Sequence, residues 1–222
     1  MEIKSTKNIA LNGVSLLVYG LPGAGKTTLI KTLRGKTLIL SAEAGLLSLQ
    51  GTDLEYIEIH SLSELYEAFN YVLDHKSEYD SVVLDSISEI AEICLQQEKM
   101  SNKDGRMAYG NMTDQVNYLI RAFRDLPINV YMTAKLEKAK DEITGRIMFQ
   151  PSMPGQKASQ SLPYYFDEVF VLRSEVNDSN ENVRFLQTFT DANYIAKDRS
   201  GRLELYEEAD LGKVIAKIGG QR

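Results

Sequence analysis

The chain has 222 residues, of which 43% are hydrophobic and 25% are charged, so it can bury a sizeable core, and we expect a single domain over residues 1–222. The net charge of −6 excludes a surface coated with basic residues for nucleic acid, although it leaves room for a local basic groove. The single cysteine, Cys94, excludes an intramolecular disulfide and suits a reducing compartment. With no apolar leader and no apolar run near the ~20 residues that span a bilayer, a cytoplasmic protein without membrane contact is expected.

Apolar runs alternate with helical patterns along the chain. Buried strands are predicted at 13–20, 37–41, 81–85 and 128–134, with further strands near 168–173, 184–190 and 193–199. Helices are predicted from Lys26 to about Leu33, after the capping box of Ser61 and Glu64, at 87–95, at 116–123 and at 211–218. This alternation predicts an α/β fold with a largely parallel central sheet flanked by helices. The later strands, two of them joined by the polar loop 174–184, predict an antiparallel edge.

A glycine-rich segment follows the first strand. GLPGAGKTT matches the phosphate-loop pattern G-x-x-x-x-G-K-[ST] in full, with a strand before it and a helix after it, which argues strongly against a chance glycine turn. The loop predicts an ATP and Mg²⁺ site, in which Lys26 reaches the β- and γ-phosphates and Thr27 binds the Mg²⁺. The residues predicted to hold the nucleotide here are Gly20, Leu21, Pro22, Gly23, Ala24, Gly25, Lys26, Thr27 and Thr28.

Two acidic residues follow buried strands. Asp85 closes strand 81–85 and is predicted to hold Mg²⁺, directly or through water; the alternative is a cap for the next helix, a task that Ser86 could perform equally well. Glu43 follows strand 37–41. Because parallel strands present their carboxyl ends at one edge, we expect Glu43 near the phosphate site, where it would orient and partly deprotonate the attacking water. The alternative for Glu43 is an acid favoured by a helix dipole.

Together with the segment LILSAEAGLLSL, these motifs resemble the RecA-type branch of P-loop ATPases, in which a strand delivers a catalytic glutamate through an Ala-Glu pair. The order of phosphate loop, glutamate strand, Asp85 strand, sensor strand and flexible loop also matches a RecA-like core. The chain is similar to small phage-encoded RecA-like ATPases linked to single-strand annealing and recombination. It departs from the pattern where RecA-type proteins place a sensor glutamine: here the strand ends MTAK, so Thr133 or Lys135 would sense the nucleotide.

The resemblance implies two loops that contact single-stranded DNA. The first would lie at 100–112, between two helices, and the second at 135–161, after the sensor strand. In the second, Lys138, Lys140, Arg146 and Lys157 would contact the backbone and Phe149 would stack on a base. The alternative for this segment is a solvated loop without a ligand.

A basic pair occurs in YIAKDRSG, residues 194–201. In a strand, Lys197 and Arg199 lie on one face, about 6.5 Å apart. The resemblance implies that such a pair acts on the ATP of the next subunit, where a cation stabilises charge on the transferred phosphoryl group. The alternative is a charged hairpin end. Catalysis in trans would require a head-to-tail homo-oligomer, either a filament or a ring.

The sequence therefore predicts a Mg²⁺-dependent ATPase that binds single-stranded DNA and acts in recombination or strand annealing, in a phage or prophage and hence in the host cytoplasm. Expected partners are single-stranded DNA, further copies of the chain and a single-strand binding protein. A nucleotide-dependent switch or loader acting on a protein partner is the main alternative. A small-molecule kinase is a third, disfavoured because the sequence has no Arg-rich lid.

Overall fold

The computed structural model describes residues 13–43, 45–140, 145–177 and 179–220. Strands and helices alternate through much of this chain, as predicted. The strands are β1 (Ser15–Gly20), β2 (Thr37–Ser41), β3 (Glu55–Glu58), β4 (Ser81–Asp85), β5 (Asn129–Lys140), β6 (Ile147–Pro151), β7 (Glu168–Val176), β8 (Asn182–Gln187), β9 (Lys197–Asp198) and β10 (Tyr206–Glu208). The helices are α1 (Leu62–His75), α2 (Ile87–Ser101), α3 (Gly105–Arg124), α4 (Gln156–Ser161) and α5 (Leu211–Ile218), with 3₁₀ helices η2 (Thr28–Thr32), η3 (Leu46–Leu49) and η4 (Leu162–Tyr165).

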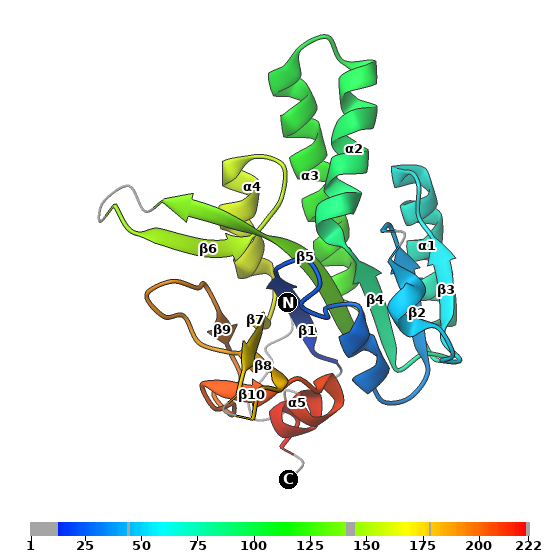
Figure 1. Ribbon diagram of the computed structural model, residues 1–222. Helices are drawn as coiled ribbons and strands as arrows, with labels where there is room; N and C mark the ends of the chain where they lie inside the picture. The colour runs from blue at the N-terminus through cyan, green and yellow to red at the C-terminus, as the bar shows by residue number, and fades with distance from the viewer. Residues whose placement is uncertain (1–12, 44, 141–144, 178, 221–222) are drawn as a thin grey trace, which may run out of the picture.

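The strands form one sheet, whose main path runs β10-β8-β7-β1-β5-β4-β2-β3 (Figure 1). From β7 to β3, neighbouring strands on this path are parallel. β8 and β10 pair antiparallel at one edge, and β6 and β9 pair antiparallel with β5 and β7. The predicted α/β fold with a largely parallel sheet and an antiparallel edge is confirmed.

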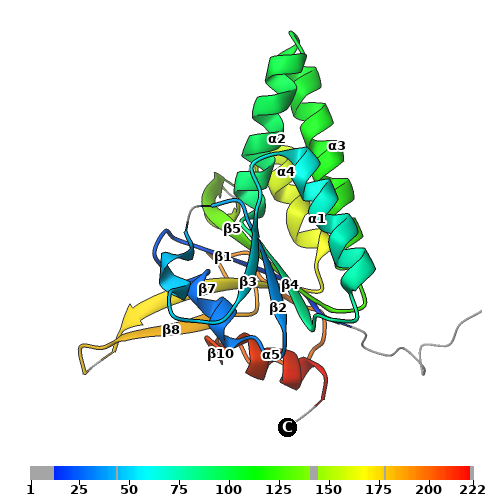
Figure 2. The ribbon, with the colours of Figure 1, turned by 90° about the vertical axis from the view of Figure 1, so that its right-hand side faces the viewer.

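Two apolar layers cover the sheet because side chains along a buried strand alternate between its faces. On β1, Leu17 and Tyr19 pack into the core formed with α1, α2, α3 and α4. Leu16 and Val18 point the other way and pack with η2, η3 and α5. Figure 2 shows α1 to α4 above the sheet and α5 below it. None of the helices in the described ranges combines the length and hydropathy that a membrane span requires.

The segment 100–112 is not the predicted loop. α2 continues to Ser101 and α3 begins at Gly105, so residues 102–104 alone join them in a helical hairpin that projects from the sheet (Figures 1 and 2). The Asp104 side chain accepts a hydrogen bond of 2.8 Å from the Arg106 N–H and so caps α3. Ala108 and Met112 are buried at helical spacing, a pattern that two glycines and several polar neighbours conceal in the sequence.

The segment 135–161 also differs from the predicted loop. β5 does not end at Lys135 but continues to Lys140 and pairs with β6, which makes a β-hairpin that projects from the sheet (Figure 1). α4 follows at Gln156. Residues 141–144 lie outside the described residues. The outer part of β5, residues 136–140, has no buried residue and carries three charged side chains, so its composition resembles that of a loop.

Two further elements are shorter than predicted. The helix expected from Lys26 to Leu33 is the 3₁₀ helix η2, because bonds such as Leu33 N–H to Ile30 O (3.1 Å) span three residues rather than four. The strand expected at 193–199 is reduced to β9. There the Asp191 carboxylate accepts bonds from two following backbone N–H groups and turns the chain before β9. The hairpin predicted around 174–184 is confirmed by β7 and β8.

Candidate functional site

The phosphate loop occupies the carboxyl end of β1. Gly20 pairs in register with Lys135 of β5, so both lie at the same edge of the sheet. Gly23 (φ 76°) and Gly25 (φ 105°) adopt backbone conformations that residues with a Cβ rarely reach, which explains both glycines. The Tyr131 hydroxyl, inside the sheet, donates a bond of 2.9 Å to the Lys26 carbonyl and supports the loop from below.

Lys26 folds back over its own loop. Its Nζ donates to the carbonyl of Gly20 (3.0 Å) and to that of Leu21 (3.2 Å). Burial lowers the pKa of Lys26, while the nearby carboxylates of Glu43 and Asp85 oppose the shift. These acids therefore favour the ammonium form, the form that a phosphate-binding lysine requires.

Asp85 lies between two hydroxyl groups. Thr27 Oγ1 donates a bond of 2.7 Å to Asp85 Oδ2, and Thr133 Oγ1 donates to Oδ1. Burial raises the pKa of this carboxyl, and the bonds from Thr133 and Thr27 lower it. The next helix is capped by Ser86, which accepts a bond from the Glu89 N–H (3.3 Å), so capping is not the task of Asp85. The Asp85 carboxylate and the Thr27 hydroxyl oxygen, 2.7 Å apart, are ligands that suit Mg²⁺. P-loop ATPases generally bind this ion with their nucleotide.

Glu43 lies beside Asp85. Its N–H donates a bond of 3.2 Å to the Asp85 carbonyl, and the Ser86 hydroxyl donates to Glu43 Oε1. The helix-dipole alternative does not apply, since η3 begins only at Leu46 and has no acidic residue in its first turn. A carboxylate held at this edge can accept a proton from water, which is the chemistry predicted for Glu43.

The sensor positions contact different neighbours. Thr133 is buried and bonds Asp85, so it lies at the predicted metal site. Lys135 forms an ion pair of 2.5 Å with Glu89 in the first turn of α2, and this bond raises the pKa of Lys135. Ser88 of α2 also contacts β5, since its Oγ accepts a bond from the Lys135 N–H (2.9 Å). The same Oγ donates to the carbonyl of Ser152, just beyond β6 (2.7 Å).

Comparison with known proteins identifies the family of this chain. Residues 12–200 match a family model described as an AAA domain. The chain belongs to this family of P-loop ATPase domains. Among solved structures, it is similar to a KaiC-like protein from the hyperthermophilic archaeon Pyrococcus horikoshii OT3, with 15% identity over 78% of this chain and 77% of that chain and a TM-score of 0.48. A search of curated proteins gives no match.

The ATPase has one residue near its phosphate loop that the sequence analysis missed. Arg184 of β8 places its guanidinium carbon 3.2 Å from the position that a Cβ on Gly25 would occupy. The sequence contains one signal for this position. In a strand, residues two apart share a face, so Arg184 lies on the same face as the core residue Leu186.

The basic pair lies away from the chain's own phosphate loop. β9 pairs with the start of β7, where Val169 is in register with Leu17, in the middle of β1. Lys197 Nζ donates to the Pro163 carbonyl (2.8 Å), and Arg199 forms an ion pair of 2.9 Å with Asp167. Any action of this pair on ATP therefore requires a second copy of the chain, as its predicted role in trans does.

A pair of carboxyl groups, one buried and one partly exposed, lies next to these cations. Glu168 is buried and faces Asp198 in register, and burial together with Asp198 raises the pKa of Glu168 to about 8. The Ser200 N–H donates a bond of 3.2 Å to Glu168 Oε1. Glu168 is thus protonated in the folded chain at neutral pH, although it would ionise near pH 4.5 when unfolded.

We predict a corresponding pH dependence of stability. The contribution of the protonated Glu168 is fully present below pH 4.5 and is lost as the pH rises towards 8, because the unfolded state then releases a proton that the folded state retains. Glu168→Gln should remove this part of the decline in melting temperature, whereas Glu204→Gln, at an exposed carboxylate, should not. Thermal unfolding scans across this pH range measure the difference, and equal slopes for wild type and Glu168→Gln would contradict it.

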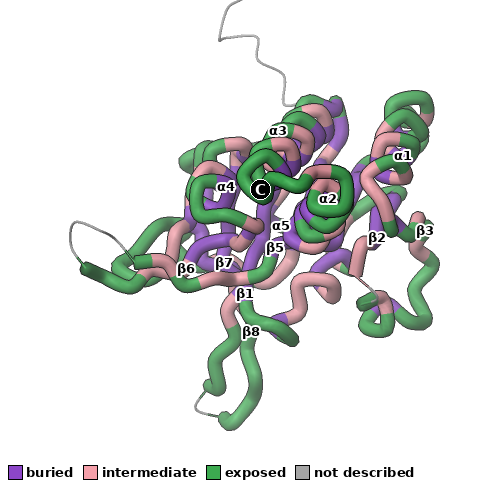
Figure 3. Tube along the Cα trace, turned by 90° about the horizontal axis from the view of Figure 1, so that it is seen from above, coloured by how far each residue is buried: buried purple, intermediate pink, exposed green. Residues whose placement is uncertain are grey.

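The residues predicted to bind DNA lie on and beside the β5–β6 hairpin. Lys138 and Lys140 are exposed on β5, Arg146 is exposed next to β6 and Lys157 is exposed on α4; Figure 3 shows how exposed this region is. Phe149 lies opposite Lys138, and its ring stacks on that of Tyr194 at 5.2 Å. A cavity of about 610 Å³ lies against the same hairpin and includes Lys138 and Lys140 in its lining.

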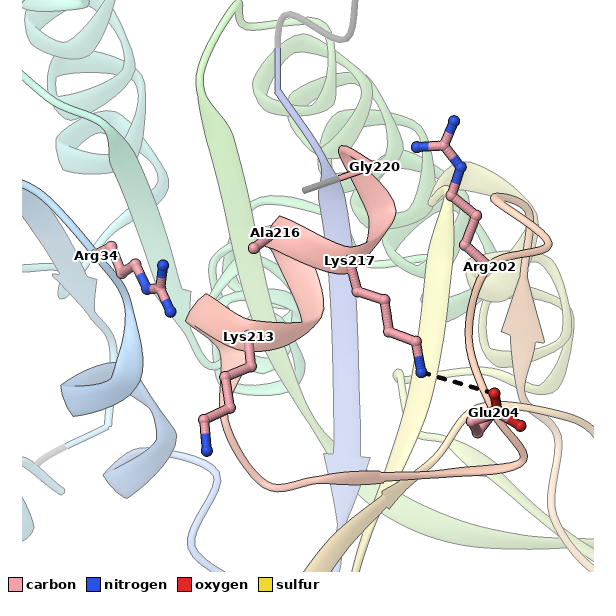
Figure 4. Close-up of a pocket in the computed structure, with 7 residues that line it drawn as sticks. All are labelled: Arg34, Arg202, Glu204, Lys213, Ala216, Lys217 and Gly220. Carbon is pink, nitrogen blue, oxygen red and sulfur yellow. Dashed lines mark ion pairs between the residues drawn. The ribbon is translucent and has the colours of Figure 1, made fainter. Parts of the chain in front are cut away.

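A second cavity, of about 820 Å³, lies beside α5 and is lined by Arg34, Arg202, Glu204, Lys213, Ala216, Lys217 and Gly220 (Figure 4). Its lining includes arginine and lysine side chains, but acidic neighbours form ion pairs with both lysines: Lys213 with Glu208 (2.6 Å) and Lys217 with Glu207 (2.5 Å). None of the lining residues belongs to the phosphate loop or the hairpin. The predicted nucleotide and DNA sites therefore lie elsewhere.

Proposed function

We propose that this P-loop ATPase hydrolyses ATP with Mg²⁺, binds single-stranded DNA through the β5–β6 hairpin, and assembles head to tail in DNA recombination or strand annealing. One observation carries the proposal: a single strand, β5, runs from the phosphate site into the basic hairpin. The phage or prophage setting, with a single-strand binding protein as a further partner in the host cytoplasm, rests on the family resemblance alone.

The continuity of β5 supports a connection between DNA binding and hydrolysis. Thr133 bonds Asp85 at the predicted metal site, Lys135 pairs with Glu89, and Lys138 is exposed on the hairpin. At about 3.3 Å per residue, Lys138 lies roughly 16 Å along the strand from Thr133. A ligand that repositions the hairpin would therefore act on the contacts of Thr133 through one continuous strand, which supports DNA-stimulated turnover.

The charges of the hairpin support a polyanionic ligand. Lys138 and Lys140 lie on one face of β5, since residues two apart in a strand share a face. The carboxylate of Glu137 lies nearby, and its two oxygens accept bonds from Gln150 (2.7 Å) and Ser152 (2.9 Å). This acid is thereby directed to its own hairpin and away from the lysine face.

We expect single-strand binding to weaken as salt rises, with a log–log slope of about −0.7 per phosphate neutralised. The triple variant Lys138→Ala/Lys140→Ala/Arg146→Ala should flatten this slope by roughly two and abolish DNA-stimulated turnover while sparing basal ATPase activity. A matched triple at Lys76, Arg124 and Lys213 removes the same charge elsewhere and should change neither. Fluorescence anisotropy with labelled oligonucleotides and ATPase assays measure these effects. An unchanged slope would place the DNA site elsewhere.

A nucleotide-dependent switch acting on a protein partner remains the second candidate. It is favoured by apolar side chains at the end of the helical hairpin, where Met100 is 87% exposed and Met107 is 55% exposed. Wild-type chain that binds nucleotide but no single-stranded DNA at any salt concentration would support this candidate over the first.

A further inference from the structure

The side chain of Arg184 lies against the phosphate loop of its own chain. Its Nε and Cζ are 3.2 Å, and its Nη1 3.4 Å, from the point that a Cβ on Gly25 would occupy. These three of the four guanidinium heavy atoms approach at nearly equal distance, so the group lies over Gly25 and does not contact it through a single terminal atom. A contact of this kind brings a permanent cation to a loop whose backbone is built to bind phosphate.

The strand pattern explains why Arg184 points this way. β8 pairs antiparallel with β7, and its residues alternate between the two faces of the sheet. Leu186 packs in the lower core with Ala24 of the phosphate loop, and Arg184, two residues earlier, shares that face. Phe185 faces the other side, where Arg173 lies over its ring. The sheet therefore holds Arg184 beside the loop through its backbone register.

Arg184 has no partner in the described part of the chain: no residue there forms a hydrogen bond or ion pair with its side chain. Arg173, on the same hairpin, does have partners: its side chain donates a bond to Gln187 (3.0 Å) and forms an ion pair with Glu175 (2.7 Å). A guanidinium group has five N–H donors and favours bidentate contact with phosphate oxygens. Arg184 is exposed, so water solvates these donors in the free chain, and a polyphosphate bound at the neighbouring loop would replace that water.

We propose that Arg184 binds the phosphate groups of the nucleotide held by its own chain. It would act as a second cation next to Lys26, supplied from β8 of the same subunit and distinct from the pair Lys197 and Arg199. Because Arg184 lies over Gly25 in the loop that holds the diphosphate portion, the contact is shared by ATP and ADP. The inference rests on the nucleotide-binding part of the proposed function and is independent of DNA.

The test is nucleotide binding without DNA. The affinities of wild type, Arg184→Ala, Arg184→Lys and the control Arg124→Ala are measured by calorimetry with Mg²⁺ and either ADP or a non-hydrolysable ATP analogue. Loss of a charge-assisted bond should weaken both ligands by about 10- to 100-fold in Arg184→Ala, with an intermediate loss in Arg184→Lys and none in Arg124→Ala. Competition by inorganic tripolyphosphate should weaken by the same factor, and thermal unfolding without nucleotide should match wild type.

Three results would overturn the proposal. Arg184→Ala with wild-type affinity would show that the guanidinium group makes no contact with the ligand. Weaker nucleotide binding with unchanged tripolyphosphate binding would assign Arg184 to the base or ribose. A loss that occurs only at protein concentrations where the chain self-associates would place the contact on a neighbour's nucleotide. If wild type itself binds no nucleotide, the ATPase proposal fails as well, so the two failures are distinguishable.

Discussion

Replacing Glu43 with glutamine should slow ATP turnover by ~10²-fold or more and leave nucleotide affinity near that of wild type. The amide has nearly the same shape as the carboxylate and can still accept a bond from the Ser86 hydroxyl, but it cannot take a proton from the attacking water. Because Glu43 is attached to Asp85 through a backbone bond rather than through its side chain, the predicted metal site should remain intact. Single-turnover assays with bound ATP separate the chemical step from binding.

A neighbouring carboxylate provides the control for this variant. Glu58 ends β3, the strand next to β2, and is exposed. Glu58→Gln removes the same charge without a contact at the phosphate edge and should turn over normally. Wild-type turnover in Glu43→Gln would mean that another group activates the water and that the catalytic role assigned to Glu43 is wrong.

The double variant Lys197→Ala/Arg199→Ala should lose ATP turnover while each chain still binds nucleotide. The reason is that both cations lie away from their own phosphate loop and, in the predicted head-to-tail assembly, meet the ATP of the next copy. Removing a cation that stabilises the transferred phosphoryl group reduces turnover by ~10³-fold or more in systems of this kind. Turnover of the wild type should also rise more steeply than linearly with protein concentration in the low range.

Mixing two inactive variants tests this expectation directly. Lys26→Ala keeps its basic pair but has no working phosphate loop, whereas the double variant keeps its loop and lacks the pair. Mixed together, they should form some junctions with both parts intact and regain part of the activity. Normal turnover of the double variant alone would mean that Lys197 and Arg199 have no catalytic role and only form the charged end of a hairpin. If the double variant is inactive and mixing restores nothing, sedimentation with a non-hydrolysable nucleotide distinguishes a role within one chain from a role in assembly.

The parts of the site at the carboxyl ends of buried parallel strands were predictable. The phosphate loop combines a complete motif with a strand before it, and Asp85 and Glu43 each follow a buried strand, so the parallel sheet brings them together. The bond between Thr133 and Asp85 also follows from this topology, since β4 and β5 are neighbours.

The remaining parts depend on contacts between distant segments. Arg184 is more than 150 positions from Gly25, and only the antiparallel register of β8 brings it to the loop. The β5–β6 hairpin was misread because Glu137, Lys138 and Lys140 dominate the outer part of β5, which therefore lacks the apolar alternation of a half-buried strand. The helical hairpin was misread because its end is exposed and Gly105 and Gly110 interrupt the helical pattern.

The position of Ser88 has a consequence for how the chain can vary in length. Its hydroxyl group, three residues after Asp85, joins the first turn of α2 to Lys135 of β5 and to Ser152, the residue after β6. An insertion or deletion between Asp85 and Ser88 would shift the helical hairpin relative to the phosphate loop and break the two bonds that join it to the base of the β-hairpin. Residues 102–104 and Lys140 lie at the far ends of the described parts of these projections, where added or lost residues would alter reach without disturbing the site. Relatives of this ATPase should therefore differ in the length of the two projections while keeping the junction of β4 and α2 constant.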